Sequence, residues 1–196
     1  PVTTGREAWL ELAERFDSIG AHYATWAEGR PAGPVSDDVR ELATRAWLRA
    51  VDLSVATGDS ASAEGRLLAL RDTATGPRSL GDLERRLGEM AAVHLDSSAA
   101  AAHFAAAWRH IHTDDRWRRR HLDLPLQAAR MASTSDDAEP VASWARAEYD
   151  GLLAGATYDE SVTVRIHLAE LDMDTDRFAT ALRRLDPVAA PILDRR

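Results

Sequence analysis

The densest group of chemically active side chains lies in residues 108–121, which read WRHIHTDDRWRRRH. Imidazole and carboxylate groups bind transition metals, so the candidate ligands of a metal-dependent helical enzyme are His103, His110, His112 and Asp115. A helical site needs ligands three or four residues apart, whereas His103 and His110 are separated by about 10 Å of helix rise. We therefore expect no cofactor and keep the metal site as an alternative.

The same segment is also a candidate nucleic-acid patch. Guanidinium groups bind phosphate and an indole stacks on bases, which makes the candidates Arg116, Trp117, Arg118, Arg119 and Arg120. Four arginines within five positions spread over about 400° of helix, so they cannot all face one groove. Aspartates at 114, 115 and 123 would also repel phosphate or pair with the arginines. A local patch at 116–121 is thus the second alternative function.

Composition excludes several classes of chemistry. The 196-residue chain has no cysteine, and its 24 basic residues are all arginine. Disulfides, thiolate nucleophiles and zinc fingers are therefore excluded, as are P-loops and Schiff bases, which require lysine. The net charge of −8 disfavours contact of the whole surface with nucleic acid or anionic lipid. Because no segment resembles a membrane span or a signal peptide, we expect a cytoplasmic protein without membrane contact.

The strongest structural signal lies near the start of the chain. Large apolar side chains recur there at steps of three and four, in a heptad seam formed by Trp9, Leu12, Phe16, Ile19, Tyr23 and Trp26. This spacing predicts a helix over residues 7–28, followed by a Gly- and Pro-containing linker at 29–35. The helix either packs in the core of the domain or serves as a docking or dimerisation arm with these six residues as its interaction face.

The remaining sequence also predicts helices. Apolar residues recur at helical spacing, no run alternates with period two, and no internal repeat has a steady period. Helix N-termini are indicated by Ser36, by either Thr113 or Asp114, and by the pair Thr157 and Glu160. The aspartates of residues 172–176 imitate a calcium loop, but arginines at 177 and 183 occupy positions that need glycine and glutamate.

These observations predict an all-α fold: one domain over residues 1–196, an irregular bundle of roughly seven to eight helices with no significant sheet. We expect a non-enzymatic, intracellular protein–protein interaction or regulatory module, with a protein partner or a homo-oligomer, a dimer for instance, as its assembly. The two alternatives are a nucleic-acid-associated factor that uses the patch at 116–121 and a metal-dependent enzyme that uses the cluster at 103–115.

Overall fold

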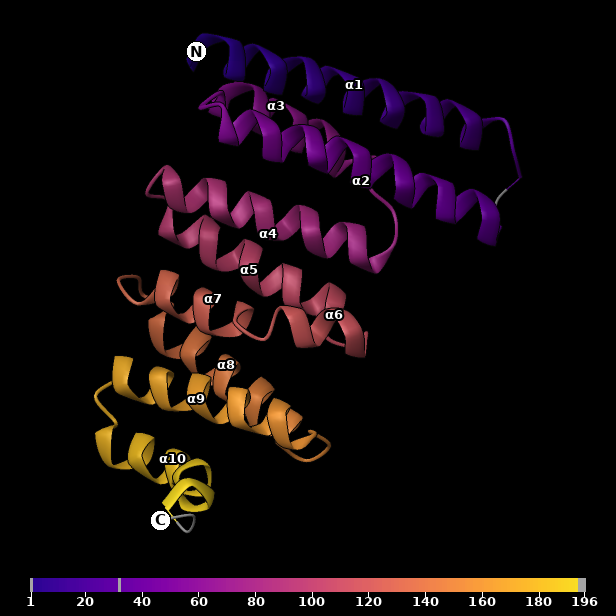
Figure 1. The fold of residues 1–196 in the computed structure, drawn as a ribbon. Coiled ribbons are helices and arrows are strands. Elements are labelled where there is room, and N and C mark those ends of the chain that lie inside the picture. The colour runs from indigo at the N-terminus through magenta and orange to yellow at the C-terminus, as the bar shows by residue number, and fades with distance from the viewer. Residues whose placement is uncertain (1, 32, 194–196) are drawn as a thin grey trace. The chain divides into compact units, whose positions relative to one another are not determined.

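The computed structural model describes residues 2–31 and 33–193 and confirms the all-α class. The described residues contain no strand and form ten helices, rather than the seven to eight predicted. Two of the ten are short, with six and nine residues, and so few turns leave little periodicity to detect. The helices are α1 (Val2–Glu28), α2 (Pro34–Ala56), α3 (Ser60–Arg71), α4 (Pro77–Val93), α5 (Ser97–Ile111), α6 (Asp115–Arg120), α7 (Leu124–Ala132), α8 (Ala138–Leu153), α9 (Tyr158–Asp174) and α10 (Phe178–Leu193) (Figure 1).

The packing divides the chain into two compact units, residues 1–90 and residues 91–196, and the division falls near the end of α4. Each unit has a hydrophobic core of its own. Two such units can still unfold together, so the single domain over 1–196 stays a prediction.

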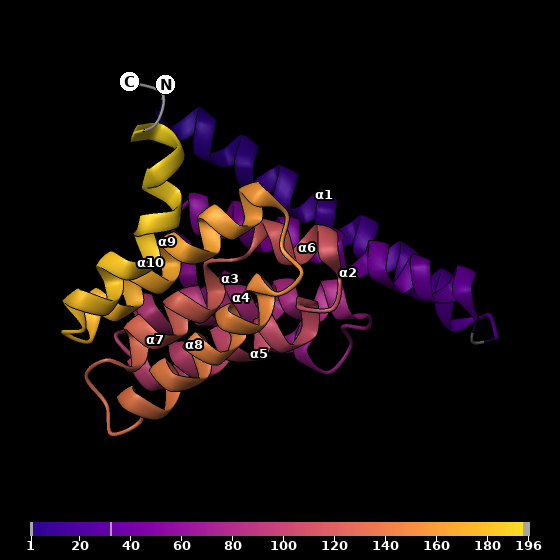
Figure 2. The same cartoon turned by 90° about the horizontal axis from the view of Figure 1, so that it is seen from below.

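In the first unit, α2 is the central helix. It packs against α1 on one side and α3 on another, and α1 runs beside α2 along most of its length (Figures 1 and 2). The larger cluster joins α2 to α3 and α4 through Leu48, Val51, Leu67 and Leu83. Ser36, predicted as an N-cap, lies inside α2, because the helix already begins at Pro34, a residue favoured at the first helical position.

The second unit is built around two buried aromatic side chains, Trp108 of α5 and Tyr149 of α8. The Trp108 indole donates a hydrogen bond to Glu148, at 2.8 Å. The Tyr149 hydroxyl donates to the Leu122 carbonyl at 2.6 Å and accepts from the Leu126 amide at 3.2 Å. Because each polar edge has a partner, both rings can be buried without leaving an unpaired group.

Three interhelical turns share one geometry that the sequence does not reveal. After α2, α4 and α9, one residue adopts a positive φ: Gly58, Leu95 or Asp176. The amide after that residue then donates back to a carbonyl five residues earlier, at 2.7–2.9 Å, in all three turns. After the first two turns, Asp59 and Asp96 cap the next helix. Only one of the three positions carries the glycine that this backbone favours, which hides the recurrence from sequence inspection.

Candidate interaction surface

The six seam residues predicted on α1 do not form the line along which α1 packs against α2. Small residues form that line instead, with Ala13, Gly20 and Ala27 buried at heptad spacing. Gly20 lies against the indole of Trp47 so closely that an added Cβ would be 2.5 Å from its Nε1. On a helical projection this line and the seam are about 70° apart. The two helices therefore approach closely, and the large side chains are displaced to one flank.

Much of the seam is consequently exposed to solvent. Trp9, Leu12 and Ile19 have exposed fractions of 51%, 40% and 44%. Phe16 is half-buried against a small cluster that includes Ala13. Tyr23 and Trp26 are also partly buried, and the Arg30 guanidinium lies 3.5 Å above the Trp26 ring. The seam is thus anchored at its inner edge and open along its outer edge.

Two residues of α2 extend this apolar surface. Val35 and Leu42 are one heptad apart, with exposed fractions of 66% and 42%. Leu48 and its neighbours, which face α3 and α4, lie on the other side of the α1 contact. α3 is located at the opposite edge of α1, where Arg66 donates to Asp17 at 2.7 and 2.9 Å. Helical geometry therefore places Val35 and Leu42 on the same side of the α1–α2 hairpin as the seam.

We call this surface the outer face; it consists of the six seam residues together with Val35 and Leu42. Sequence reasoning found the six and missed the two on α2. Their spacing of seven was visible, but nothing in the sequence indicated which of the apolar positions on α2 would be covered by α1, α3 and α4.

The predicted metal ligands do not converge. His112 is exposed and its Nδ1 lies 3.0 Å from the Arg109 carbonyl, whereas Asp115 pairs with Arg118 at 2.8 Å. His103 and His110 are partly buried on α5. Within residues 2–31 and 33–193, no three histidine, aspartate or glutamate side chains are grouped so that they could hold a metal ion.

The predicted nucleic-acid patch is divided by a buried carboxylate. Arg118 donates to Glu160 Oε1 at 2.9 Å, and Arg119 lies 3.4 Å from Oε2 of the same residue. Trp117 packs on the core and stacks against His121, with 5.6 Å between ring centroids. Of the four arginines, only those at 116 and 120 are both exposed and outside the ion-pair cluster around Glu160. The segment therefore fixes α6 to the start of α9 through two of its four arginines.

Glu160 was predicted to form a capping box with Thr157. In the structure Thr157 caps the helix, but the Glu160 carboxylate has a different partner. The Thr157 hydroxyl caps α9 by accepting from the Glu160 amide at 3.4 Å. The Glu160 carboxylate is buried and faces the arginines of α6 instead. Of the two N-cap candidates Thr113 and Asp114, the structure selects Asp114, whose carboxylate accepts from two amides of α6 at 3.1 Å.

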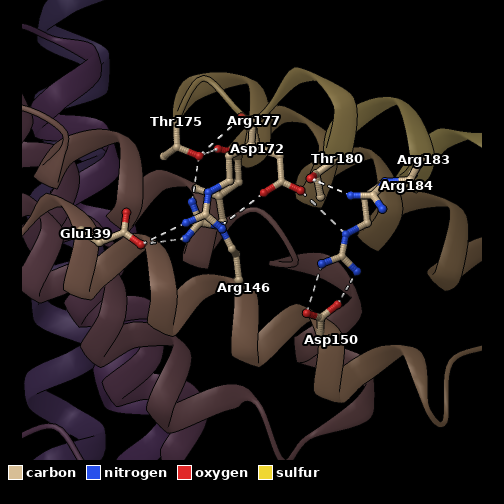
Figure 3. A network of polar contacts seen from close by, with 10 residues as sticks. Glu139, Arg146, Asp150, Asp172, Thr175, Arg177, Thr180, Arg183 and Arg184 are labelled. Carbon is tan, nitrogen blue, oxygen red and sulfur yellow. Dashed lines mark hydrogen bonds and ion pairs between the residues drawn. The ribbon is translucent and has the colours of Figure 1, made fainter.

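A second buried ion network, which the sequence did not predict, joins α8, α9 and α10 (Figure 3). Asp172, part of the false calcium motif, is 1% exposed and lies 3.3 Å from Arg146 and 3.7 Å from Arg184. Arg146 also donates to Thr175 Oγ1 at 2.7 Å, and Arg184 pairs with Asp150 at 2.6 Å. These contacts connect three helices and account for the charges without any ligand.

Beside this network, a cavity of about 440 Å³ opens where α7, α8 and α9 meet. The charged side chains that line this cavity form ion pairs and hydrogen bonds mainly with neighbouring side chains. Arg130 donates to Asp174 at 2.8 Å, and this hydrogen bond raises the pKa of the guanidinium. Glu139 lies 3.3 Å from Arg146 and 3.4 Å from Arg177. The cavity thus presents no unpaired nucleophile or general base among these residues.

Comparison of the chain with protein-family models, with curated proteins and with solved structures gives no match. Among the described helices, none combines the length and the apolar character that crossing a membrane would require.

Proposed function

We propose that this chain is a non-enzymatic protein-interaction module and that the outer face is its contact surface. The observation that carries the proposal is the exposure of five large apolar side chains on one side of a single hairpin, at Trp9, Leu12, Ile19, Val35 and Leu42. Isolated exposed apolar residues are normal, but a contiguous group that includes tryptophan is typical of binding surfaces.

The packing of α1 against its neighbours supports the same proposal. The contact of Gly20 with Trp47 and the ion pair of Asp17 with Arg66 fix α1 in place from its inner side. The outer face is therefore presented by an ordered scaffold, and a partner would not have to order the helix before it binds. Preorganisation of this kind reduces the entropic cost of association.

The two alternatives have less support. A nucleic-acid role would require the arginines of α6 to face phosphate, yet Arg118 and Arg119 bind Glu160. A metal-dependent enzyme would require converging ligands, and the residues proposed from the sequence do not form such a group in the described structure.

Site-specific photo-crosslinking tests the proposal. Benzoylphenylalanine is placed at Ile19 in the outer face and, as a matched control, at Leu68, an exposed leucine on α3 outside that face. In cells that express the chain, we expect a discrete protein adduct at position 19, identified by mass spectrometry, and none at position 68. Equal labelling at both positions, or no adduct at position 19, would contradict the proposal.

A further inference from the structure

We infer that the partner of the outer face is a second copy of this chain, bound about a two-fold axis so that the two α1 helices run antiparallel. The two α1–α2 hairpins then form a four-helix bundle. This inference rests on the proposed function, because it names the occupant of the same surface. The arguments come from the sizes of the seam side chains, the exposed area and the charge distribution along α1.

The side-chain sizes along the seam are complementary to those of a second seam that runs in the opposite direction. An axis through the middle of α1, near residues 17 and 18, brings each residue opposite the one at the mirrored position. The layers nearest the axis then combine one aromatic with one aliphatic side chain, Phe16 with Ile19 and Leu12 with Tyr23. The layers farthest from the axis pair two tryptophans, Trp9 with Trp26. A parallel pair would instead oppose Phe16 to Phe16 and Tyr23 to Tyr23. Alternation of large and small residues packs more evenly than layers of two aromatic rings.

The exposed area is large enough for such a dimer. With roughly 150–250 Å² for each large side chain, the exposed fractions of Trp9, Leu12, Ile19, Val35 and Leu42 amount to on the order of 500 Å² per copy. Two copies would thus bury on the order of 1,000 Å² from these residues alone, close to the lower limit of specific interfaces. The exposed parts of Phe16, Tyr23 and Trp26 add to this area.

The charges of α1 also favour the antiparallel arrangement. Up to residue 17 the helix carries four carboxylates, at Glu7, Glu11, Glu14 and Asp17, against two arginines at 6 and 15, which leaves this half with an excess of two negative charges. Beyond residue 17 the carboxylate of the helix is Glu28, which is followed by Arg30. Antiparallel packing separates the two acidic halves, and a parallel pair would place them side by side. In the antiparallel arrangement, neighbouring helices of the bundle also run in opposite directions, as in up-and-down four-helix bundles.

Analytical ultracentrifugation tests self-association. We expect the purified chain to dimerise reversibly, and Ile19→Glu to raise the dissociation constant by at least about 100-fold, because the two-fold axis introduces each new carboxylate twice. Leu68→Glu, an equivalent change outside the outer face, should leave the constant unchanged, and circular dichroism shows that both variants stay helical. A wild-type chain that remains monomeric at on the order of 100 µM overturns the inference.

The absence of cysteine allows the direction of the helices to be measured directly. Glu11→Cys, Ser18→Cys and Thr25→Cys place a spin label at three exposed positions one heptad apart on the same stripe. The antiparallel dimer predicts the shortest label-to-label distance at position 18, because the labels at 11 and 25 are offset by about 20 Å along the axis. Equal distances at the three positions indicate a parallel dimer and contradict the inference.

The two proposals fail in different ways. If the chain is monomeric but position 19 crosslinks to another identified protein, the second copy is excluded and the interaction surface stands. If position 19 yields no adduct with any chain, both proposals fail.

Discussion

Replacement of Gly20 by alanine tests the close packing that displaces the seam to the outer face. The added Cβ would lie 2.5 Å from Trp47 Nε1 and 2.7 Å from two further ring atoms, well inside normal contact distance. Trp47 is partly buried against the core cluster that α2 shares with α3 and α4, so a displacement of the indole would disturb this packing. We therefore expect the hairpin to open slightly or the indole to leave its rotamer.

The magnitude follows from two opposing contributions. Alanine in place of glycine stabilises a helix interior by about 1 kcal/mol, whereas overpacking costs about 1–3 kcal/mol. The net effect of Gly20→Ala is then a loss of about 0–2 kcal/mol in the free energy of unfolding. Gly65 on α3 is the matched control, because it is exposed and a Cβ there would meet no atom within 4 Å. Gly65→Ala should stabilise the chain by about 0.5–1 kcal/mol.

Urea unfolding followed by circular dichroism at 222 nm measures both changes. Because the two units can unfold in separate transitions, both changes are read from the transition of the unit 1–90, to which Gly20 and Gly65 belong. A smaller side chain at position 47, as in Trp47→Leu, should relieve the clash and give a coupling of at least about 1 kcal/mol in a double-mutant cycle. If the two glycine substitutions stabilise the chain equally, the close approach of α1 to Trp47 is wrong.

Two further predictions concern the second unit. Leu95 is 88% exposed and has a φ of 61°, so Leu95→Gly should raise the free energy of unfolding by about 1 kcal/mol in a urea titration; a loss of stability would show that the leucine side chain contributes a contact. Burial raises the pKa of the Tyr149 phenol above its ordinary value, so its contribution to stability is complete below about pH 10 and declines at higher pH. In an alkaline titration the absorbance change of this tyrosine at 295 nm should coincide with loss of helix, and ionisation with the helices intact would contradict its burial.

Local signals in the sequence predicted local structure well. The N-cap at Thr157 is confirmed, and so is Asp114, one of two candidates with Thr113, because each depends on a hydrogen bond to an amide two or three residues away. The N-cap predicted at Ser36 is wrong, because α2 begins two residues earlier. The all-α class is confirmed for the same reason, since helical periodicity is a property of short windows. The partner of a charged side chain has no such signal. Glu160 is 42 residues from Arg118, and Asp172 is 26 residues from Arg146, so neither ion pair could be predicted from spacing.

The prediction for α1 shows where periodicity itself stops being informative. The helix has two heptad lines, one of large side chains and one of Ala13, Gly20 and Ala27, and a hydrophobicity pattern gives more weight to the first. Packing selects the second, because small residues let α1 approach α2 closely enough for Gly20 to contact Trp47. Burial of both lines within one chain would need a further helix on the flank of α1 opposite α3. The outer face is exposed for this reason, and the same geometry that fixes α1 to α2 leaves the larger side chains available to a partner.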